Sequence, residues 1–335
     1  MSKSVSFSRW AVIILLFCAC GLYVRAQAQN PPPGHPPQNA RPAQPGSINY
    51  VEGQAAIDGQ PLGANSVGTA QLAAGQTLTT QTGKVEVLLT PGVFLRVGDN
   101  SSIKMISPDL ANTEVSVDKG EAMVEVNDIS KDNRIVIDEG GAKTRLLKKG
   151  LYDFDAGQDQ VRVFKGKARV EASDRNLNVG GDHLVTLNTS GKLKSRHFDT
   201  KQYADELYRW SGLRSGYLAE ADADAARLYA NGGPGWVGSG WYWDPWFDGY
   251  TFIPGGGIYY SPFGWGFYSP FSIWDSPFIY GGFYGHPHRF NDFHPPYGHG
   301  FEPRGGFHGG FHGGGFRGGG FHGGGGFHGG GGGHR

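Results

Sequence analysis

The sequence predicts an all-β domain, built as a sandwich or a short β-helix-like stack, followed by a short helical segment and a disordered tail. Three observations support this fold class. Short segments of alternating apolar and polar residues fill residues 48–190, which is typical of strands. Helical spacing of apolar residues begins only after this part of the chain. Glycine, aromatic residues and histidine then accumulate towards the C-terminus, where chain this rich in glycine cannot form a packed core.

Residues 1–28 have the features of a secretory signal peptide. Two basic residues precede the apolar run at 10–24, and Ala-Gln-Ala at 26–28 has the spacing of a cleavage site. The run is shorter than the roughly 20 residues that a spanning helix needs, so we expect no transmembrane span in the mature chain. The sequence therefore predicts export to the periplasm or cell surface, with lipoprotein anchoring through Cys20 as the alternative.

Residues 29–47 form a proline-rich spacer, which is stiff and extended. The whole chain has 335 residues, with 30 basic against 30 acidic side chains. A formal charge near zero gives no electrostatic reason to expect nucleic acid or an anionic membrane as a partner.

Within residues 48–190, a unit of strand, glycine and strand recurs around Gly120, Gly150 and Gly166. We expect each glycine to occupy a backbone position that a side chain would disfavour. Pro91-Gly92 is a predicted turn. The clearest strands are residues 84–89, 93–97, 114–117, 122–126, 134–137, 161–164 and 168–170.

The order of these segments resembles the FecR domain, the periplasmic module of bacterial regulators linked to iron-citrate uptake. The resemblance is carried by GQTLTT, KVEVLL, VFLRV, VSVDKGEAMVEV and VRVFKGKARV, and it covers most of residues 50–188. It implies an exported β-domain and supplies no catalytic residues. Regulators of this family also carry a cytoplasmic helical segment that binds a sigma factor. Because nine residues precede the apolar run, we expect that segment to be absent.

Residues 196–231 are predicted to be a helical connector, because apolar residues there recur at helical spacing. The connector is either one helix or two helices broken near Gly212 or Gly216. Asp222 and Asp224 lack further acidic ligands at loop spacing, so we interpret them as part of a solvated helix face rather than a cation site.

Residues 232–303 form an aromatic region rich in glycine and proline, and seven of the eight tryptophans lie between Trp210 and Trp274. Two interpretations stay open. The rings either pack on the β-domain and on each other, or form exposed stacking platforms for sugar rings or a partner surface. An envelope protein or a cell-wall glycan would be the corresponding partner.

The sequence predicts no catalytic residues and no cofactor. Motifs for zinc peptidases, serine hydrolases and nucleotide binding are absent, and the mature chain has no cysteine nucleophile. His183 and His197 have no local base or carboxylate arrangement, so we interpret both as hydrogen-bonded structural residues.

Residues 304–335 are a Gly/His-rich low-complexity tail. Neutral imidazole is a good ligand for Zn, Ni or Cu, but a flexible chain presents no fixed geometry, so any binding here would be weak and non-selective. The competing interpretation is a solubilising or adhesive tail. The candidate metal ligands each follow a phenylalanine and are His308, His312, His322 and His328.

Together these features predict a non-enzymatic, exported, FecR-like binding or scaffolding module of the bacterial cell envelope. One alternative is a periplasmic ligand sensor that acts through a separate membrane protein. The other is a glycan or cell-wall binder that uses the aromatic region.

Overall fold

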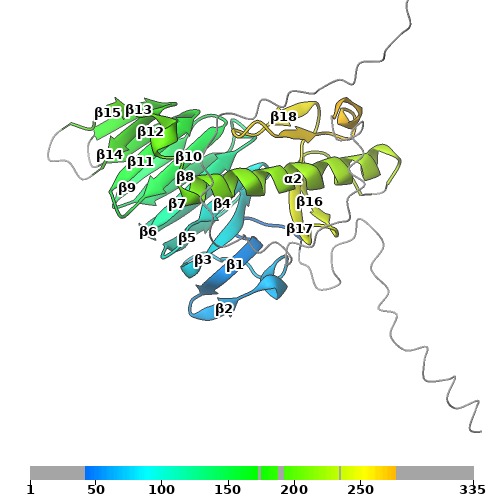
Figure 1. The fold of residues 1–335 in the computed structure, drawn as a ribbon, viewed down its shortest axis with the longest axis horizontal. Coiled ribbons are helices and arrows are strands. Elements are labelled where there is room, and N and C mark those ends of the chain that lie inside the picture. Colours follow the sequence, from blue (N-terminus) through cyan, green and yellow to red (C-terminus); the bar gives the residue numbers. More distant parts are fainter. Residues whose placement is uncertain (1–41, 173–174, 188–191, 234, 277–335) are drawn as a thin grey trace, which may run out of the picture. The chain divides into compact units, whose positions relative to one another are not determined.

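The alternating segments of the β-domain form one continuous sheet, shown in blue to green in Figure 1. The structure is a computed structural model that describes residues 42–172, 175–187, 192–233 and 235–276. In chain order the strands of this sheet are β1 (Ile48–Ile57), β2 (Gln60–Leu62), β3 (Thr77–Thr90), β4 (Val93–Val97), β5 (Ser102–Pro108), β6 (Asn112–Lys119), β7 (Glu121–Val126), β8 (Arg134–Glu139), β9 (Ala142–Leu146), β10 (Gly150–Asp155), β11 (Gln160–Lys165), β12 (Lys167–Ala172), β13 (Arg175–Gly180), β14 (His183–Thr186) and β15 (Ser195–His197).

The strands pair in the order β13-β12-β9-β8-β6-β5-β3-β4-β7-β10-β11-β14-β15, with β1 beside β3 and β2 beside β1. The pair β6–β8 is parallel, and the other described pairs of this sheet are antiparallel. The all-β prediction is confirmed, and each of the seven predicted strands lies within an observed one.

The inner face of the sheet surrounds one aliphatic core. Along β3 the residues alternate, so that Val85, Val87 and Leu89 join this core. Val179 of β13 and Val185 of β14 belong to it as well, although their strands lie near opposite ends of the strand order. The sheet therefore curls until its ends nearly meet, and burial of these side chains is the main force that holds it in that shape.

Glycines occupy the corners where the strand, glycine and strand unit was predicted to need them. Gly120 has φ 76° and Gly166 has φ 101°, in the left-handed region that disfavours side chains. A Cβ at Gly166 would also overlap the Tyr152 hydroxyl, and one at Gly150 would overlap the carbonyl oxygen of Lys165. The expectation for these three glycines is confirmed.

The connector contains one long helix, α2 (Glu206–Ala230), preceded by a 3-10 turn, η2 (Thr200–Gln202). A further 3-10 turn, η1 (Ala64–Ser66), follows β2. Asp205 begins α2, because its side chain accepts a hydrogen bond from Tyr208 N. The helix continues through both glycines at which a break was considered, so that alternative is wrong.

The glycines of α2 serve close packing instead of a break. A Cβ at Gly212 would lie 3.1 Å from the Phe263 ring, and one at Gly216 would lie 3.0 Å from the Trp265 ring. Trp265 Nε1 also donates to Gly212 O at 3.1 Å. The absence of side chains at these two positions lets two aromatic rings approach the backbone of α2.

The first part of the aromatic region forms two small antiparallel hairpins. These are β16 (Gly240–Asp244) with β17 (Gly249–Ile253), and β18 (Ile258–Tyr260) with β19 (Gly266–Tyr268), followed by the 3-10 turn η3 (Ile273–Asp275).

Phe252 of β17 and Phe267 of β19 are fully buried and share a cluster with Leu88 and Phe94 on the outer face of the large sheet. Of the two interpretations of the aromatic region, packing on the β-domain therefore describes these two rings. Other large aromatic residues of this region stay exposed, namely Trp246, Tyr260, Trp265, Phe271 and Trp274.

Candidate functional site

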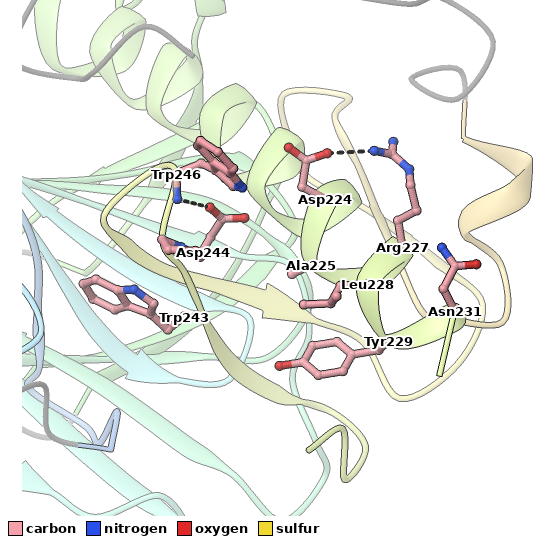
Figure 2. Close-up of a pocket in the computed structure, with 10 residues that line it drawn as sticks. Asp224, Ala225, Arg227, Leu228, Tyr229, Asn231, Trp243, Asp244 and Trp246 are labelled. Atoms are coloured by element: carbon pink, nitrogen blue, oxygen red, sulfur yellow. Dashed lines mark hydrogen bonds and ion pairs between the residues drawn. The ribbon is translucent and has the colours of Figure 1, made fainter. Parts of the chain in front are cut away.

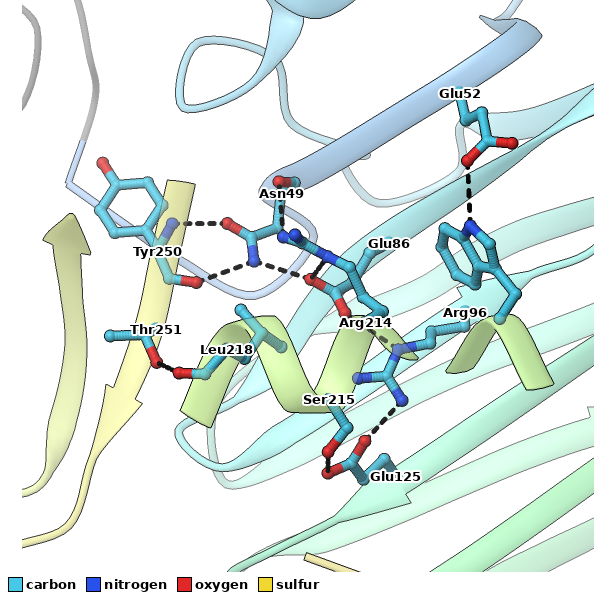
Figure 3. Close-up of polar contacts among 11 residues, drawn as sticks. Asn49, Glu52, Glu86, Arg96, Glu125, Arg214, Ser215, Leu218, Tyr250 and Thr251 are labelled. Atoms are coloured by element: carbon cyan, nitrogen blue, oxygen red, sulfur yellow. Dashed lines mark hydrogen bonds and ion pairs between the residues drawn. The ribbon is translucent and has the colours of Figure 1, made fainter. Parts of the chain in front are cut away.

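Three charged side chains lie on the outer face of neighbouring strands. Glu86 of β3 pairs across from Arg96 of β4, and Glu125 lies on the next strand, β7. All three alternate with inward-facing core residues, yet each is 0% exposed. The helix α2 crosses this face and covers them (Figure 3).

Ion pairs join these residues to each other and to the helix. Arg96 Nε donates to Glu86 Oε2 at 2.9 Å, and Arg96 Nη1 donates to Glu125 Oε2 at 2.5 Å. From α2, Arg214 Nε donates to Glu86 Oε1 at 3.1 Å, and Ser215 Oγ donates to Glu125 Oε1 at 2.7 Å (Figure 3). Two guanidinium groups thus meet two carboxylates. We call these five residues the balanced cluster.

Asn49 of β1 connects the balanced cluster to the first aromatic hairpin. Its Nδ2 donates to Glu86 Oε1 and to Tyr250 O, each at 2.8 Å, and its Oδ1 accepts from Tyr250 N at 2.7 Å (Figure 3). Thr251 Oγ1 donates to Leu218 O of α2 at 2.6 Å. The hairpin is therefore hydrogen-bonded both to the first strand of the sheet and to the helix.

Arg96 stays charged although it is fully buried. Burial alone would lower its pKa, but the carboxylates of Glu125 and Glu86 outweigh that effect, so the pKa is raised above its ordinary value. Buried ion pairs offset their own desolvation only when geometry and hydrogen bonding are good. The balanced cluster therefore acts chiefly by requiring one defined position of the helix on the sheet.

A second, partly buried cluster lies near the start of α2, and its charges do not balance. Arg162 of β11 donates to Asp153 at 2.5 Å and to Asp155 at 2.7 Å, and lies 3.4 Å from Glu121. The carboxyl group of Glu121 also lies next to that of Asp205, the residue that caps α2. One guanidinium thus contacts three carboxyl groups, with a fourth beside them, and we call these five residues the acid-excess cluster.

The surroundings of the acid-excess cluster favour the protonated form of its carboxyl groups. Burial, followed by the charges of Asp153 and Asp205, raises the pKa of Glu121 in spite of the nearby Arg162. Burial raises the pKa of Asp153 as well. A protonated Glu121 can donate a hydrogen bond to Asp205, whereas two ionised carboxylates side by side would repel each other.

A cavity of about 310 Å³ opens between the C-terminal half of α2 and the turn from β16 to β17 (Figure 2). Asp244 lies in its wall and is 2% exposed, with Oδ1 accepting from Trp246 N at 2.7 Å and from Phe247 N at 3.1 Å. Burial raises the pKa of Asp244 to about 6. Trp246 is 57% exposed, and Asp224 pairs with Arg227 at 2.9 Å on the helix side. We call this the Trp246 cavity.

The two aspartates that were interpreted as a solvated helix face behave differently. Asp224 is at the surface, but Asp222 is fully buried and its Oδ2 accepts from Tyr268 N at 2.5 Å. The solvated interpretation is therefore wrong for Asp222. The reason is that the second hairpin covers this side of α2, where Ala223 and Ala226 pack against Tyr268.

The candidate metal ligands His308, His312, His322 and His328 lie outside the described residues. No group of three or more metal-ligating side chains occurs in the described part of the chain. The histidines at 183 and 197 face each other across β14 and β15, with ring centroids 5.6 Å apart, and His183 Nδ1 lies 2.7 Å from Gly181 O. These contacts fit the structural interpretation.

The sequence analysis did not predict the two ion clusters, although the sequence contains a signal for them. Glu86 and Arg96 lie in stretches that carry apolar residues on both faces of the sheet, since Leu88 and Phe94 lie on the outer face too. A strand that is apolar on both faces is buried on both faces. The charged residues in such a strand can therefore be expected to have buried partners.

Comparison with known proteins identifies the β-domain. A family model described as FecR protein matches residues 76–169, so the chain carries a FecR domain there. Two crystal structures of a "putative anti-sigma factor" from Parabacteroides distasonis, at 1.65 and 2.50 Å resolution, are similar to 38% of this chain at 16% identity, with TM-scores of 0.34 and 0.33. The similarity spans 62% and 61% of those chains. No curated protein matches. None of the described helices is long and apolar enough to cross a membrane.

Proposed function

We propose that the protein is a non-enzymatic binding or scaffolding module of the bacterial cell envelope, exported by its N-terminal signal peptide. In this proposal the FecR domain is the rigid support, and the aromatic region after α2 presents the binding surface. The supporting observation is the chain of buried contacts through Asn49, Glu86 and Arg214, which ties that region to the sheet. A surface fixed in advance loses little conformational entropy when it binds.

The chemistry of the charged residues fits binding better than catalysis. The charged groups of the balanced cluster are buried beneath α2, as are Arg162 and Asp153 of the acid-excess cluster, and all of these groups are engaged with charged partners. A catalytic acid or base must reach a substrate proton, and groups enclosed in this way would first require the helix to move. Their arrangement is suited to holding α2 and the hairpins in place.

Fractionation of cells combined with mass spectrometry of the mature N-terminus tests the proposed location. We expect a chain that begins after residue 28 in the periplasmic or surface fraction, or a lipidated Cys20 in the membrane fraction. An unprocessed chain in the cytoplasm would refute the export proposal.

A binding role in the envelope is tested by pull-down on insoluble cell wall. The relevant variant replaces three exposed aromatic residues, Trp246, Phe271 and Trp274, by alanine. The matched control replaces three exposed aliphatic residues of the β-domain, Ile106, Leu110 and Leu147. We expect only the first variant to lose binding. If both variants bind the cell wall equally well, the aromatic region is not the binding surface.

The glycan alternative is favoured by the exposed rings, because aromatic faces stack on sugar rings with little loss of entropy. The sensor alternative is supported by the FecR domain itself. Photo-crosslinking from position 274 in cells distinguishes them. Capture of an integral membrane protein would support the sensor, and capture of glycan fragments would support the cell-wall binder.

A further inference from the structure

The Trp246 cavity combines an aromatic ring with carboxylates. Figure 2 shows Trp246, Asp224 and Asp244 around one part of the cavity, with Tyr229 on the helix side. Trp246 is 57% exposed although it stands in a turn held by two backbone hydrogen bonds to Asp244. The backbone of the turn is therefore held in place, and more than half of Trp246 is exposed for contact.

Asp244 supplies a buried carboxylate with unused hydrogen-bonding capacity. The side chain is 2% exposed, and both of its hydrogen bonds to described residues are made by Oδ1. A carboxylate has about four acceptor positions on its two oxygens. Asp244 lines the cavity, so Oδ2 can accept a proton donor or contact a positive charge there.

The electrostatic environment of the cavity is negative. Besides Asp244, the cavity wall contains Asp224, and Glu220 lies close enough to raise the pKa of Asp244. Arg227 is the cation of the wall, and it is engaged by Asp224 at 2.9 Å. A negatively charged ligand would meet repulsion, whereas a cation would relieve the repulsion among the carboxylates.

We propose that the Trp246 cavity binds a small organic cation, an ammonium group carried on a short apolar body. Ammonium groups are attracted to the face of tryptophan, most strongly where water is partly excluded, and a nearby carboxylate completes the contact. The volume of about 310 Å³ is at the lower end of that of small-molecule sites. This inference rests on the binding role proposed above and names the ligand class of one site.

Titration calorimetry on the mature full-length protein tests the proposal with choline and ethanolamine as probes. The neutral control is 3,3-dimethylbutan-1-ol, which has the shape of choline with carbon in place of nitrogen. We expect at least one ammonium compound to bind at least about tenfold more tightly than the neutral alcohol. Equal affinity for the alcohol, or no binding of either ammonium compound, would overturn the proposal.

Two variants locate the binding. Trp246→Ala removes the ring, and Asp244→Asn removes the charge but keeps an oxygen that can accept from the Trp246 and Phe247 amides. We expect each to weaken ammonium binding about tenfold with an unchanged circular dichroism spectrum. Tyr260→Ala, a change at an aromatic residue of 60% exposure that does not line the cavity, should leave the affinity unchanged. An equal loss in Tyr260→Ala, or no loss in Trp246→Ala, would place the binding elsewhere and overturn the assignment.

N-acetylglucosamine is the remaining probe, because it is a neutral sugar. If it binds at Trp246 and the ammonium compounds do not, the cavity is a glycan site and the cation proposal fails while the binding function stands. If the protein also fails to bind cell wall, the proposed function fails with it.

Discussion

The balanced cluster and the acid-excess cluster lie on the same outer face of the sheet, beneath the same helix, but they differ in charge. The balanced cluster pairs Arg96 and Arg214 with two glutamates. In the acid-excess cluster Arg162 contacts three carboxyl groups, and a fourth, that of the capping residue Asp205, lies next to Glu121. The positive end of the α2 dipole lies beside this second cluster and favours negative charge there.

The difference shows that one helix can be fixed to a sheet in two ways. At the balanced cluster, every charged group keeps a partner of opposite charge, so the contact should hold over a broad pH range. At the acid-excess cluster, the contact depends on a retained proton, so it should weaken as pH rises. Four variants test this contrast, beginning with the one of largest effect.

Arg96→Met should destabilise the protein by about 3–5 kcal/mol, because it leaves two glutamates buried with Arg214 as the remaining guanidinium. Urea denaturation followed by tryptophan fluorescence measures the loss. The control is Arg145→Met, at an exposed position on β9, which should change the stability by less than about 0.5 kcal/mol. Similar losses in the two variants would show that the balanced cluster does not hold the helix.

Gly166→Val should destabilise by more than about 1 kcal/mol, because φ is 101° and the new Cβ would overlap the Tyr152 hydroxyl. The damage is geometric, so the loss should be the same at pH 5 and pH 9. Gly180→Val is the control, since a Cβ there meets nothing within 4 Å. A loss that varied with pH would show that the change had disturbed the nearby charges.

Glu121→Gln should raise the stability at pH 9 by more than about 1 kcal/mol and change it little at pH 5. The pKa of Glu121 in the folded protein is raised above the ordinary value of 4.5. Protonated Glu121 therefore makes its full contribution to the free energy of unfolding below pH 4.5. This contribution is lost as pH rises through the pKa of Glu121 in the folded protein. Glutamine stays neutral and can still donate to Asp205. A stability gain that is the same at both pH values would contradict a retained proton.

Lys143→Gln should have the smallest effect, below about 0.5 kcal/mol, and the effect should vanish in 1 M salt. Lys143 lies 2.5 Å from Glu114, but its side chain is 49% exposed to water, which screens the pair. Thermal melts at low and high salt measure it. If the loss of stability is as large as that of Arg96→Met, burial does not explain why the clusters stabilise the protein more than surface ion pairs do.

Much of the β-domain could be predicted from the sequence because its strands follow a local rule. In KVEVLL and VFLRV, apolar residues recur at every second position, and the core residues Val85, Val87 and Leu95 follow from that pattern alone. The need for glycine at positions 120 and 166 could also be read from the recurring unit. These features depend on neighbours along the chain.

The candidate sites could not be predicted in the same way, because their partners lie far away in the sequence. Glu86 meets Arg214, which is 128 residues later, and Asp222 becomes buried only because the second hairpin covers it. The glycines at 212 and 216 look like helix breaks until Phe263 and Trp265 are placed against them. The N-terminal signal and the histidines of the tail stay predictions.

The hydrogen bonds between Asn49 and Tyr250 close a loop of 201 residues. Closing a flexible loop of that length costs about 5 kcal/mol in chain entropy, whereas two hydrogen bonds contribute about 1 kcal/mol each. The contact therefore cannot form by itself, and it exists only in molecules whose intervening chain is already in place. The side-chain amide of Asn49, followed by its NMR resonance, would thus report the fraction of molecules that have completed folding.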